Sequence, residues 1–209
     1  MTLLVGLTGN IASGKSSAAA FLAARGAVLV DSDVAAREAV LPGTAALAAV
    51  VARFGAGMLH EDGSLDRGRL GALVFGDPAA RAALEAIVHP AVEASRQRAV
   101  VAARAAGAGI VVCDIPLLFE ARLAWQFPRI LLVDAPAPVR IARLVTDRGL
   151  SPAHAAARVA AQLPATLKRG RADLVVDNDG DRAALHARLH AAWQRLQAWA
   201  AVATTQCAA

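Results

Sequence analysis

A phosphate-binding loop near the start of the chain constrains the fold more than any other feature of the sequence. Residues 9–16 read Gly-Asn-Ile-Ala-Ser-Gly-Lys-Ser and fit the pattern G-x-x-x-x-G-K-[ST] without a mismatch. An apolar run, Leu3–Leu7, precedes the pattern, and an alanine-rich stretch follows it. In such a strand–loop–helix unit, backbone N–H groups and the positive end of the helix surround a polyphosphate. We therefore predict a nucleoside triphosphate site, against the alternative of a glycine-rich turn that binds no ligand.

Each polar residue of the loop has an expected role. Lys15 is expected to reach the β- and γ-phosphates, and the hydroxyl of Ser16 to hold Mg²⁺. Of the 22 basic residues, only Lys15 and Lys168 are lysines and the rest are arginines. A chain that uses arginine almost everywhere has kept a compact ammonium group at position 15. The predicted nucleotide-binding segment comprises Gly9, Asn10, Ile11, Ala12, Ser13, Gly14, Lys15, Ser16 and Ser17.

Composition bounds the class of protein. The 209 residues suit one medium-sized domain with inserted subdomains. No apolar stretch approaches the roughly 18 residues of a membrane span, and no basic segment precedes Leu3–Leu7, so this run is predicted to be a strand and not a signal peptide. Cys113 and Cys207 form no metal or disulfide spacing. We expect a cytoplasmic protein without a membrane partner.

The positive net charge of +5, with a pI near 10.5, raises the question of nucleic-acid binding. The arginines are scattered, however, and the chain contains no tyrosine and no dense basic run with interleaved aromatic residues. We therefore expect no nucleic-acid partner and assign the charge to recognition of an anionic small molecule.

Five short apolar runs alternate with helical stretches, which predicts a doubly wound α/β fold with a parallel sheet. In such sheets, ligands bind outside the carboxyl ends of the strands. Those ends carry Gly9 and four aspartates, which suit a metal–nucleotide site. The runs are Leu3–Leu7, Ala27–Val30, Ile110–Cys113, Ile130–Val133 and Leu174–Val176, and the aspartates are Asp31, Asp114, Asp134 and Asp177.

The interval from the second strand to the third is too long for a simple crossover. Residues 34–108 are predicted to form an inserted substrate-covering subdomain, with helices starting at Pro78 and at Pro90. Residues 143–171 are predicted to form a lid, with helices starting at Pro152 and Pro164. Between Asp181 and Ala201, apolar residues recur at helical spacing and predict a helix packed on the sheet, followed by a frayed tail at 204–209. Those apolar residues are Leu185, Leu189, Trp193, Leu196 and Trp199.

Two aspartates are candidates for the chemistry of phosphoryl transfer. This reaction needs charge neutralisation and one carboxylate that orients the attacking hydroxyl and accepts its proton. Asp33, in the segment Asp31-Ser32-Asp33 that closes the second strand, is the candidate for that role, although Asp31 or Asp33 could instead cap the next helix. Asp114, after the third strand, is the candidate for holding Mg²⁺, although many strands end in aspartate.

Three further groups leave two interpretations open. His89, before Pro90, is either catalytic or, as we favour, structural. The cluster Arg140, Arg143 and Arg148 either closes over phosphates or forms an exposed charged face of a helix. The segment Leu117, Leu118, Phe119 and Glu120 is either part of a site or a packed loop.

Taken together, these motifs resemble the dephospho-coenzyme A kinase family, over nearly the whole chain to about residue 180. The loop pattern alone is shared by many proteins, whereas the ordered series of D-x-D, H-P, P-L-L-F-E and A-D…D-N is far more specific. The matching segments are Gly6–Ser16, Asp31-Ser32-Asp33 with Arg37, Asp62–Arg67, Val88-His89-Pro90, Asp114–Glu120, Gln162, Lys168, Ala172-Asp173 and Asp177-Asn178.

The resemblance implies a five-stranded parallel sheet with helices on both faces, a helical coenzyme A-binding subdomain and a lid, similar to nucleoside monophosphate kinases. It implies transfer of the γ-phosphoryl group of MgATP to the ribose 3′-hydroxyl of dephospho-coenzyme A. Asp33 would be the hydroxyl-orienting base, Lys15 and the loop would hold ATP, and Ser16 would bind Mg²⁺. The acceptor site would be lined by Arg37, His89 and residues 117–120. We expect a monomer or weak oligomer.

One departure from the family pattern lies in the lid. The family often has Gln-x-x-Arg-Leu-x-x-Arg, whereas this chain has Arg140 in the first position and Asp147 in the last, followed by Arg148. A shift by one residue turns a helical side chain by about 100°, so Arg143 and Arg148 both remain candidates for contact with ATP. The alternatives to the family function are another small-molecule or nucleoside monophosphate kinase and a regulatory nucleotide-binding module. A guanine-reading switch protein is disfavoured, because neither asparagine precedes a lysine.

Overall fold

The structure, a computed structural model, describes residues 1–205 and divides the chain into two compact units. The sheet unit consists of Met1–Val30 and the chain from Ala102 onward, and the helical unit is Asp31–Val101. The predicted insertion, residues 34–108, overlaps the helical unit. Cys207 and the last four residues of the predicted frayed tail lie outside the described residues.

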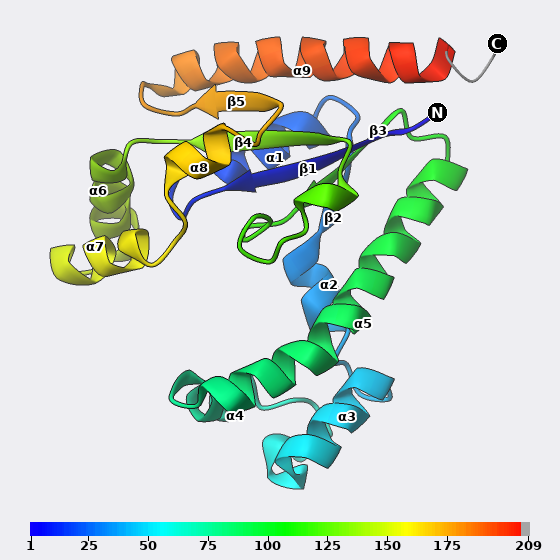
Figure 1. The fold of residues 1–209 in the computed structure, drawn as a ribbon, viewed down its shortest axis with the longest axis vertical. Coiled ribbons are helices and arrows are strands. Elements are labelled where there is room, and N and C mark those ends of the chain that lie inside the picture. Colours follow the sequence, from blue (N-terminus) through cyan, green and yellow to red (C-terminus); the bar gives the residue numbers. More distant parts are fainter. Residues whose placement is uncertain (206–209) are drawn as a thin grey trace. The chain divides into compact units, whose positions relative to one another are not determined.

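All five predicted strands form, and they belong to one sheet in the order β2-β3-β1-β4-β5 (Figure 1). β1 pairs in parallel with β3 and β4, and β4 pairs in parallel with β5. The prediction of a five-stranded α/β sheet is therefore confirmed. The strands are β1 (Leu3–Gly9), β2 (Val28–Asp31), β3 (Ile110–Asp114), β4 (Arg129–Asp134) and β5 (Leu174–Asp177).

Both faces of the sheet are covered, which explains why its strands read as continuous apolar runs. Alternate residues of β1, among them Val5 and Leu7, join the main core with residues of α1 and α9. Gly6 points to the opposite face, where Leu118 and Phe127 cover it. The helical elements of this unit are α1 (Lys15–Ala23), η2 (Ala124–Gln126), α6 (Ala137–Arg148), α7 (Pro152–Ala160), α8 (Ala165–Arg169) and α9 (Arg182–Thr205).

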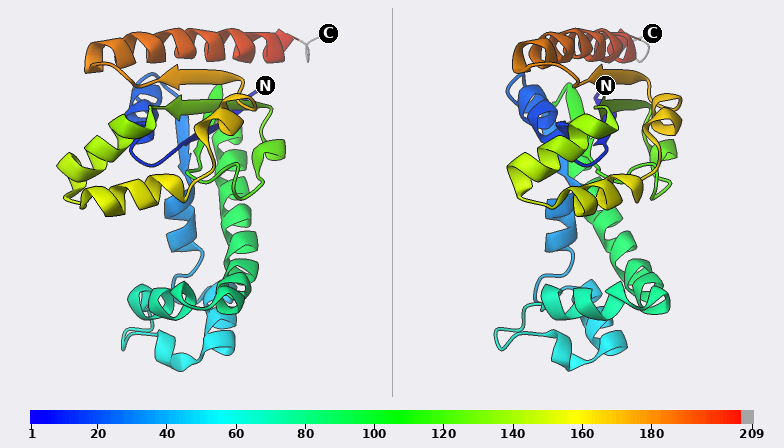
Figure 2. Two further views of the ribbon diagram at one scale, coloured as in Figure 1. Left: turned by 60° about the vertical axis from the view of Figure 1, so that its left-hand side comes forward. Right: turned by 90° about the vertical axis from the view of Figure 1, so that its left-hand side faces the viewer.

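The C-terminal helix packs as its apolar spacing predicts. Figure 2 shows α9 running beside β5, with which it is in contact. Five of its residues, Leu185, Leu189, Ala192, Trp193 and Leu196, are buried in the main core, and Trp199 packs against that core while partly buried. The helix continues to Thr205, so the prediction of a frayed tail is wrong for residues 204 and 205.

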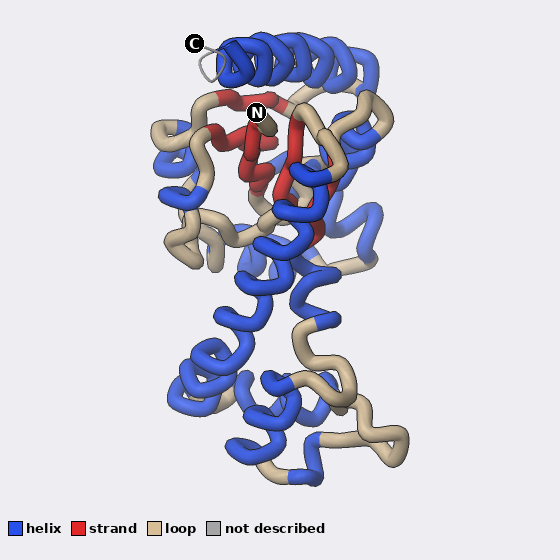
Figure 3. The backbone as a smooth tube through the Cα atoms, turned by 90° about the vertical axis from the view of Figure 1, so that its right-hand side faces the viewer, coloured by secondary structure: helices blue, strands red, loops and turns tan. Residues whose placement is uncertain are grey.

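The helical unit is built of helices joined by loops (Figure 3). Side chains cap the N-termini of its four α-helices. Asp31 accepts hydrogen bonds from the N–H groups of Asp33 and Val34, so the cap of α2 is Asp31 and not Asp33. Asp77 accepts from Ala79 and Ala80, which confirms the predicted helix start at Pro78. The elements are α2 (Ser32–Glu38), α3 (Ala45–Phe54), η1 (Ala56–Met58), α4 (Arg67–Phe75) and α5 (Pro78–Ala105), of which the part beyond Val101 belongs to the sheet unit.

Of the other three predicted helix starts, those at Pro152 and Pro164 are confirmed and the one at Pro90 is wrong. Helices α7 and α8 begin directly after Ser151 and Pro164, and the hydroxyl of Ser151 accepts from the N–H of His154 at 3.3 Å. Pro90, in contrast, lies inside α5 and starts no helix. A proline removes one backbone hydrogen bond without ending a helix whose two halves are both packed, and the usual result is a bend. Figure 1 shows α5 bent along its length.

Candidate functional site

The predicted phosphate loop joins a buried strand to a helix, as expected. β1 ends at Gly9 and α1 begins at Lys15. Ser13 N–H donates to the carbonyl of Asn10 at 3.0 Å and turns the chain, while Ala12 and Gly14 adopt left-handed backbone conformations with φ of 59° and 96°. No side chain of the described residues caps α1. Its first N–H groups therefore remain available for an anion.

The two glycines of the motif are required by close approaches. A Cβ atom on Gly9 would lie 2.5 Å from Ser13 Oγ and 2.6 Å from the carbonyl oxygen of Val133. A Cβ atom on Gly14 would collide with the side-chain amide of Asn178 and would also sit on a backbone of positive φ. The loop therefore tolerates no larger residue at either position without moving.

Polar side chains from distant parts of the sequence hold the backbone of the loop. Gln162 Oε1 accepts from the N–H of Ile11 at 2.7 Å, and Asn178 Nδ2 donates to the carbonyl of Ser13 at 2.7 Å. Arg143 Nη1 donates to the carbonyl of Ala12 at 3.2 Å and its Nη2 to the carbonyl of Asn178 at 3.0 Å. These bonds fix the shape of the loop before any nucleotide binds, so less ordering is needed on binding.

Lys15 lies against the end of the neighbouring strand. Its ammonium group forms an ion pair with Oδ1 of Asp114, the last residue of β3, and both side chains are mostly buried. Ser16 and Ser17 follow at the exposed start of α1. The structure thus brings the predicted phosphate-binding lysine and the predicted magnesium ligand together.

The donors near the loop fit a nucleotide-bound magnesium ion. In nucleotide sites Mg²⁺ retains waters and phosphate oxygens, and the protein supplies only one or two oxygen ligands. Asp114, at the end of β3, and Ser16, in the first turn of α1, carry oxygen donors of this kind beside the loop. In the described chain no cluster of three or more acidic, histidine or cysteine residues could hold a metal by itself.

Two other strand-end aspartates of the sheet unit have a different role. Arg169 of α8 donates to Oδ2 of Asp134 at 2.9 Å and to Oδ1 of Asp177 at 2.5 Å. The bonds to Asp177 and then Asp134 raise the pKa of Arg169 above its usual value. These two carboxylates therefore anchor α8 to the sheet. Of the strand-end aspartates of the sheet unit that were expected to face a metal, only Asp114 is left for that role.

The three arginines of α6 occupy three different environments. Arg140 is buried, its Nε donates to the carbonyl of Ala135, and burial lowers its pKa although Asp134 acts in the opposite direction. Arg143 contacts the phosphate loop, as described above. Arg148 is exposed at the end of the helix. A uniformly exposed charged face is therefore excluded, and Arg143 is the arginine of the three that touches the loop.

The segment after β3 is largely interior. Leu118 and Phe119 are buried, whereas Leu117 is 48% exposed. Glu120 Oε1 accepts from Lys168 Nζ at 2.6 Å and from the N–H of Leu163 at 3.3 Å. Among these four predicted acceptor-site residues, Glu120 therefore binds the segment that leads into α8, through Leu163, and α8 itself, through Lys168.

A groove of about 680 Å³ opens beside the phosphate loop. It lies between α1 and the start of α9 and includes Ser17, Arg143 and Asn178, three residues at or next to the loop. Its remaining lining combines apolar atoms with charged ends, namely Ala20, Phe21, Ala24, Arg25, Gly180, Asp181, Arg182, Leu185 and His186. A planar base and a sugar are of a size and polarity that suit such a groove.

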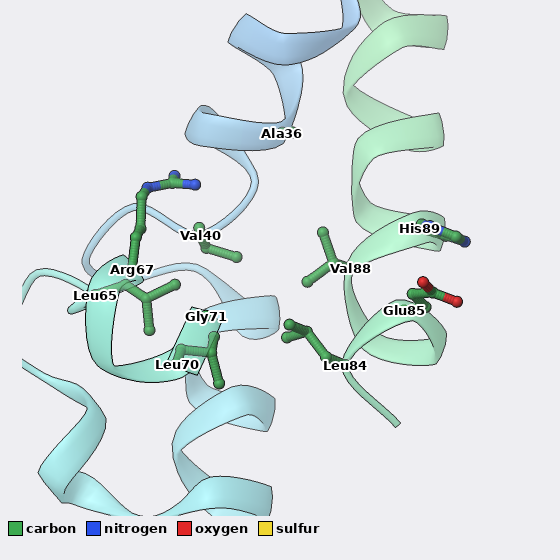
Figure 4. A pocket seen from close by; sticks show the side chains of 10 residues that line it. All are labelled: Ala36, Val40, Leu65, Arg67, Leu70, Gly71, Leu84, Glu85, Val88 and His89. Carbon is green, nitrogen blue, oxygen red and sulfur yellow. The ribbon is translucent and has the colours of Figure 1, made fainter. Parts of the chain in front are cut away.

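The helical unit carries the other predicted residues. Asp33 and Arg37 lie on α2 and His89 on α5, and all three side chains are exposed. Within this unit is an apolar pocket of about 270 Å³, in which Figure 4 shows Val40, Leu70 and Val88 directed toward a common space. The other lining residues are Ala36, Leu65, Arg67, Gly71, Leu84, Glu85 and His89.

The role of Gln162 and Asn178 in holding the loop could not be read from the sequence. Both residues matched the family segments, but Gln162 lies 151 residues and Asn178 lies 165 residues from the loop residue whose backbone it binds. The sequence offers one clue to the role of Asn178, which is that asparagine is rare: Asn10 and Asn178 are the only asparagines of the chain. The side chains of both donate to backbone carbonyls at this site.

Comparisons with known proteins agree with this geometry. The sequence profile described as dephospho-CoA kinase matches residues 3–184. The chain is 48% identical over 194 residues to a dephospho-CoA kinase of Frankia casuarinae, covering 93% of this chain and 83% of the relative. It is 46% identical over 195 residues to that of Thermobifida fusca, covering 93% and 96%. Among the described residues, no helix is both long and apolar enough to cross a membrane.

Solved structures show the same fold. The crystal structure of TT1252 from Thermus thermophilus superimposes with a TM-score of 0.76 at 36% identity, covering 93% of this chain and 98% of that chain. A dephospho-CoA kinase from Campylobacter jejuni has the same fold, with a TM-score of 0.73 at 23% identity over 94% and 98% of the two chains. From the profile match over most of its length and the identities to these relatives, the chain belongs to the dephospho-CoA kinase family.

Proposed function

We propose that the chain transfers the γ-phosphoryl group of ATP to the ribose 3′-hydroxyl of dephospho-coenzyme A, giving coenzyme A and ADP. The observation that carries the proposal is the fastened phosphate loop, with Lys15 beside Asp114, in a chain whose family match runs from residue 3 to residue 184. The loop supplies a triphosphate site, and the family supplies the acceptor. The reaction would be the last step of coenzyme A synthesis.

On the donor side, each residue of the loop has a physical task. The N–H groups of residues 9–17 and the open start of α1 would surround the phosphates of ATP. Lys15 would neutralise charge on the β- and γ-phosphates, and Arg143 would add a positive charge beside the loop. Magnesium, when bound with ATP, would supply charge neutralisation at the phosphate oxygens, with Ser16 and Asp114 as its protein contacts. Arg148 would contribute at the lid, residues 143–171.

On the acceptor side, Asp33 would orient the 3′-hydroxyl and accept its proton as the bond to phosphorus forms. This role fits its place in α2, because Asp31 has taken over the cap and leaves the carboxylate of Asp33 exposed. Arg37 and His89 would bind polar groups of the acceptor, and Leu117 would touch it directly. Leu118, Phe119 and Glu120 would act by holding the shape of their segment.

The apolar pocket of the helical unit suits the pantetheine arm of the same acceptor. The arm carries a dimethyl group and methylenes between amides, and the pocket combines six aliphatic side chains with polar ends at Arg67, Glu85 and His89. The helical unit would thus be the acceptor-binding subdomain. Burial of the arm would provide binding energy far from the reacting hydroxyl.

A coupled ADP-release assay with product identification by mass tests the proposal. Dephospho-coenzyme A is compared with a panel of nucleoside monophosphates, each with MgATP. Formation of coenzyme A from dephospho-coenzyme A alone is expected. Phosphorylation of a nucleotide instead would assign the chain to another small-molecule kinase of this fold, and ATP binding without turnover would make it a regulatory module.

The proposal includes the setting of the enzyme. Cys113 is a buried cysteine in the core of the sheet, which suits a reducing compartment, and we place the reaction in the cytoplasm. The enzyme would act as a monomer or weak oligomer with two small-molecule partners, ATP and dephospho-coenzyme A. Size measurement of the purified protein by light scattering, with and without both substrates, tests the oligomeric state.

A further inference from the structure

Lys168 is the second of the two lysines, and nothing in the proposed reaction requires it. Its side chain has no exposed surface, and its Nζ donates to Glu120 Oε1 at 2.6 Å. Burial of an ammonium group is unfavourable unless a charged partner is present. Nearly all other basic residues of the chain are arginines. A fully buried lysine therefore indicates a specific task for a compact ammonium group.

Glu120 connects this lysine to the chain that holds the phosphate loop. The oxygen that accepts from Lys168 also accepts from the N–H of Leu163 at 3.3 Å. The carbonyl of Leu163 in turn accepts from Asn10 Nδ2 at 3.3 Å, and the adjacent Gln162 accepts from the N–H of Ile11. The N–H of Leu163 therefore bonds to Glu120, and its carbonyl oxygen bonds to Asn10 of the loop.

We propose that Lys168 and Glu120 are positioning residues that hold residues 162–163 and, through them, set the conformation of the phosphate loop for ATP. Lys168 balances the charge of Glu120 in the interior, and Glu120 fixes the peptide of Leu163. Gln162 and Leu163 then fix Ile11 and Asn10. Neither Lys168 nor Glu120 needs to touch a substrate. The inference rests on the proposed function only in that the loop binds ATP, and not on the identity of the acceptor.

The charge relation within the pair makes a specific test available. In Lys168→Met, the carboxylate of Glu120 stays buried without its cation and is expected to rearrange, which releases Leu163. In the double variant Lys168→Met/Glu120→Gln, the amide oxygen can still accept from Leu163 while no unpaired charge remains. The single change should therefore disturb the loop, and the second change should restore it.

The measurements are direct ATP binding without acceptor, steady-state KM and kcat, and hydrogen exchange of the loop amides. A misplacement of about 1 Å can reduce the rate about 100-fold, so we expect Lys168→Met to weaken ATP binding roughly 10- to 100-fold. Exchange at residues 10–14 should rise, while the KM for the acceptor changes about twofold or less. The double variant should recover most of the loss. The matched control is Arg129→Met, which also removes an ion pair, with Asp173. Arg129 is the first residue of β4, at the end of the strand that lies away from the phosphate loop.

Several outcomes would overturn the inference. One is ATP binding and loop exchange in Lys168→Met within about twofold of the wild type, a change too small for a displaced loop. Another is failure of the double variant to recover ATP binding although its thermal stability recovers. If Lys168→Met does not fold, the half-buried Gln162 tests the same chain of contacts. Gln162→Ala should then weaken ATP binding and raise exchange at Ile11, and a wild-type result would equally refute the inference.

Discussion

The two units of the molecule differ in how their functional side chains are held. In the sheet unit, Lys15, Asp114 and Arg143 are all engaged in ion pairs or hydrogen bonds around the phosphate loop. In the helical unit, Asp33, Arg37 and His89 are exposed. No hydrogen bond from any of these three side chains to another described residue is present.

This difference follows from the chemistry that each unit would perform. A polyphosphate is bound by many backbone dipoles whose directions must be correct before the ligand arrives. The sheet unit therefore fixes its loop with buried polar groups, among them Asn10, Lys168 and Asn178. An acceptor with a long flexible arm can instead be bound by an apolar pocket and a few exposed polar ends, which need less prior order. Mutations should consequently affect stability and activity together in the first unit and separately in the second.

The largest effect on activity alone is expected at Asp33. Loss of a general base reduces rates by about 10²- to 10⁴-fold, so Asp33→Asn should lower kcat by that amount. The thermal midpoint and the affinity for ATP should change little, because this exposed side chain does not cap α2. The readouts are initial rates, ATP binding and thermal unfolding.

Asp31→Asn is the matched control for this change. Asp31 caps α2, and asparagine caps a helix as well as aspartate does. This variant should keep the helix and most of the activity. A near-normal kcat for Asp33→Asn would remove Asp33 from the mechanism, and an equal loss in both variants would mean that the two carboxylates act together.

Gly14→Ala should affect activity and stability together. The new methyl group would collide with Asn178 and occupy a backbone of positive φ, a conformation that costs about 1–3 kcal/mol for a residue other than glycine. We expect the kcat/KM for ATP to fall about 100-fold, as for other displacements near 1 Å, with a lower thermal midpoint.

Gly149→Ala separates the two causes. Gly149 also has a positive φ, of 63°, but a Cβ atom there would meet nothing within 4 Å. Its thermal midpoint should fall while its KM for ATP stays close to the wild-type value. Equal effects of the two substitutions on ATP would show that backbone strain alone, and not the contact with Asn178, determines the loop.

The phosphate loop and the strands could be predicted, because each is encoded by a contiguous stretch of sequence. The loop pattern fixes strand, turn and helix within about 20 residues, and the apolar runs located all five strands. Pro90 was misread for the same local reason: a proline after a polar residue predicts a helix start, but α5 continues through it. The helix has buried residues on both sides of the proline, such as Ala80 before it and Val100 after it. Local patterns thus predict elements well where tertiary contacts do not oppose them.

The part that depends on long-range contacts could not be predicted. Asp31 and Asp33 were equivalent as helix caps in the sequence, and only the backbone geometry of α2 assigns the cap to Asp31. Asp134 and Asp177 end strands just as Asp114 does, yet Arg169 binds them both. Whether an acidic side chain is free for chemistry depends on which cation the fold brings to it, and spacing along the chain does not contain that information.

The apolar pocket of the helical unit gives a smaller predicted effect, confined to the acceptor. Val88→Thr keeps the shape of the side chain but replaces a methyl group of the pocket wall with a hydroxyl, which removes apolar area from contact with the arm and should weaken its binding by about 1 kcal/mol. The KM for dephospho-coenzyme A should rise about fivefold or more, which is the equivalent of about 1 kcal/mol, and the KM for ATP should not change. Val101→Thr, in the same helix but 62% exposed, is the control.

A truncated acceptor sharpens this prediction. If the pocket binds the pantetheine arm, Val88→Thr should have no effect on the inhibition constant of a competing ligand that lacks the arm, such as AMP. An equal loss of affinity for AMP and for dephospho-coenzyme A would mean that the substitution perturbs the helical unit in general. An unchanged KM for dephospho-coenzyme A would place the arm elsewhere.

The smallest predicted effect concerns pH and the helical unit. Asp66 caps α4, and the hydrogen bond from the N–H of Arg69 lowers the pKa of its carboxyl, with nearby His60 and Arg69 acting in the same direction. A lowered pKa stabilises the fold above the unfolded-state pKa, and this contribution is lost as the pH falls through the folded-state value. Asp66→Asn keeps a cap that does not titrate. Thermal midpoints at pH 7 and pH 3 should therefore differ less in this variant than in the wild type, and an identical or larger difference would show that the cap contributes through its shape and not its charge.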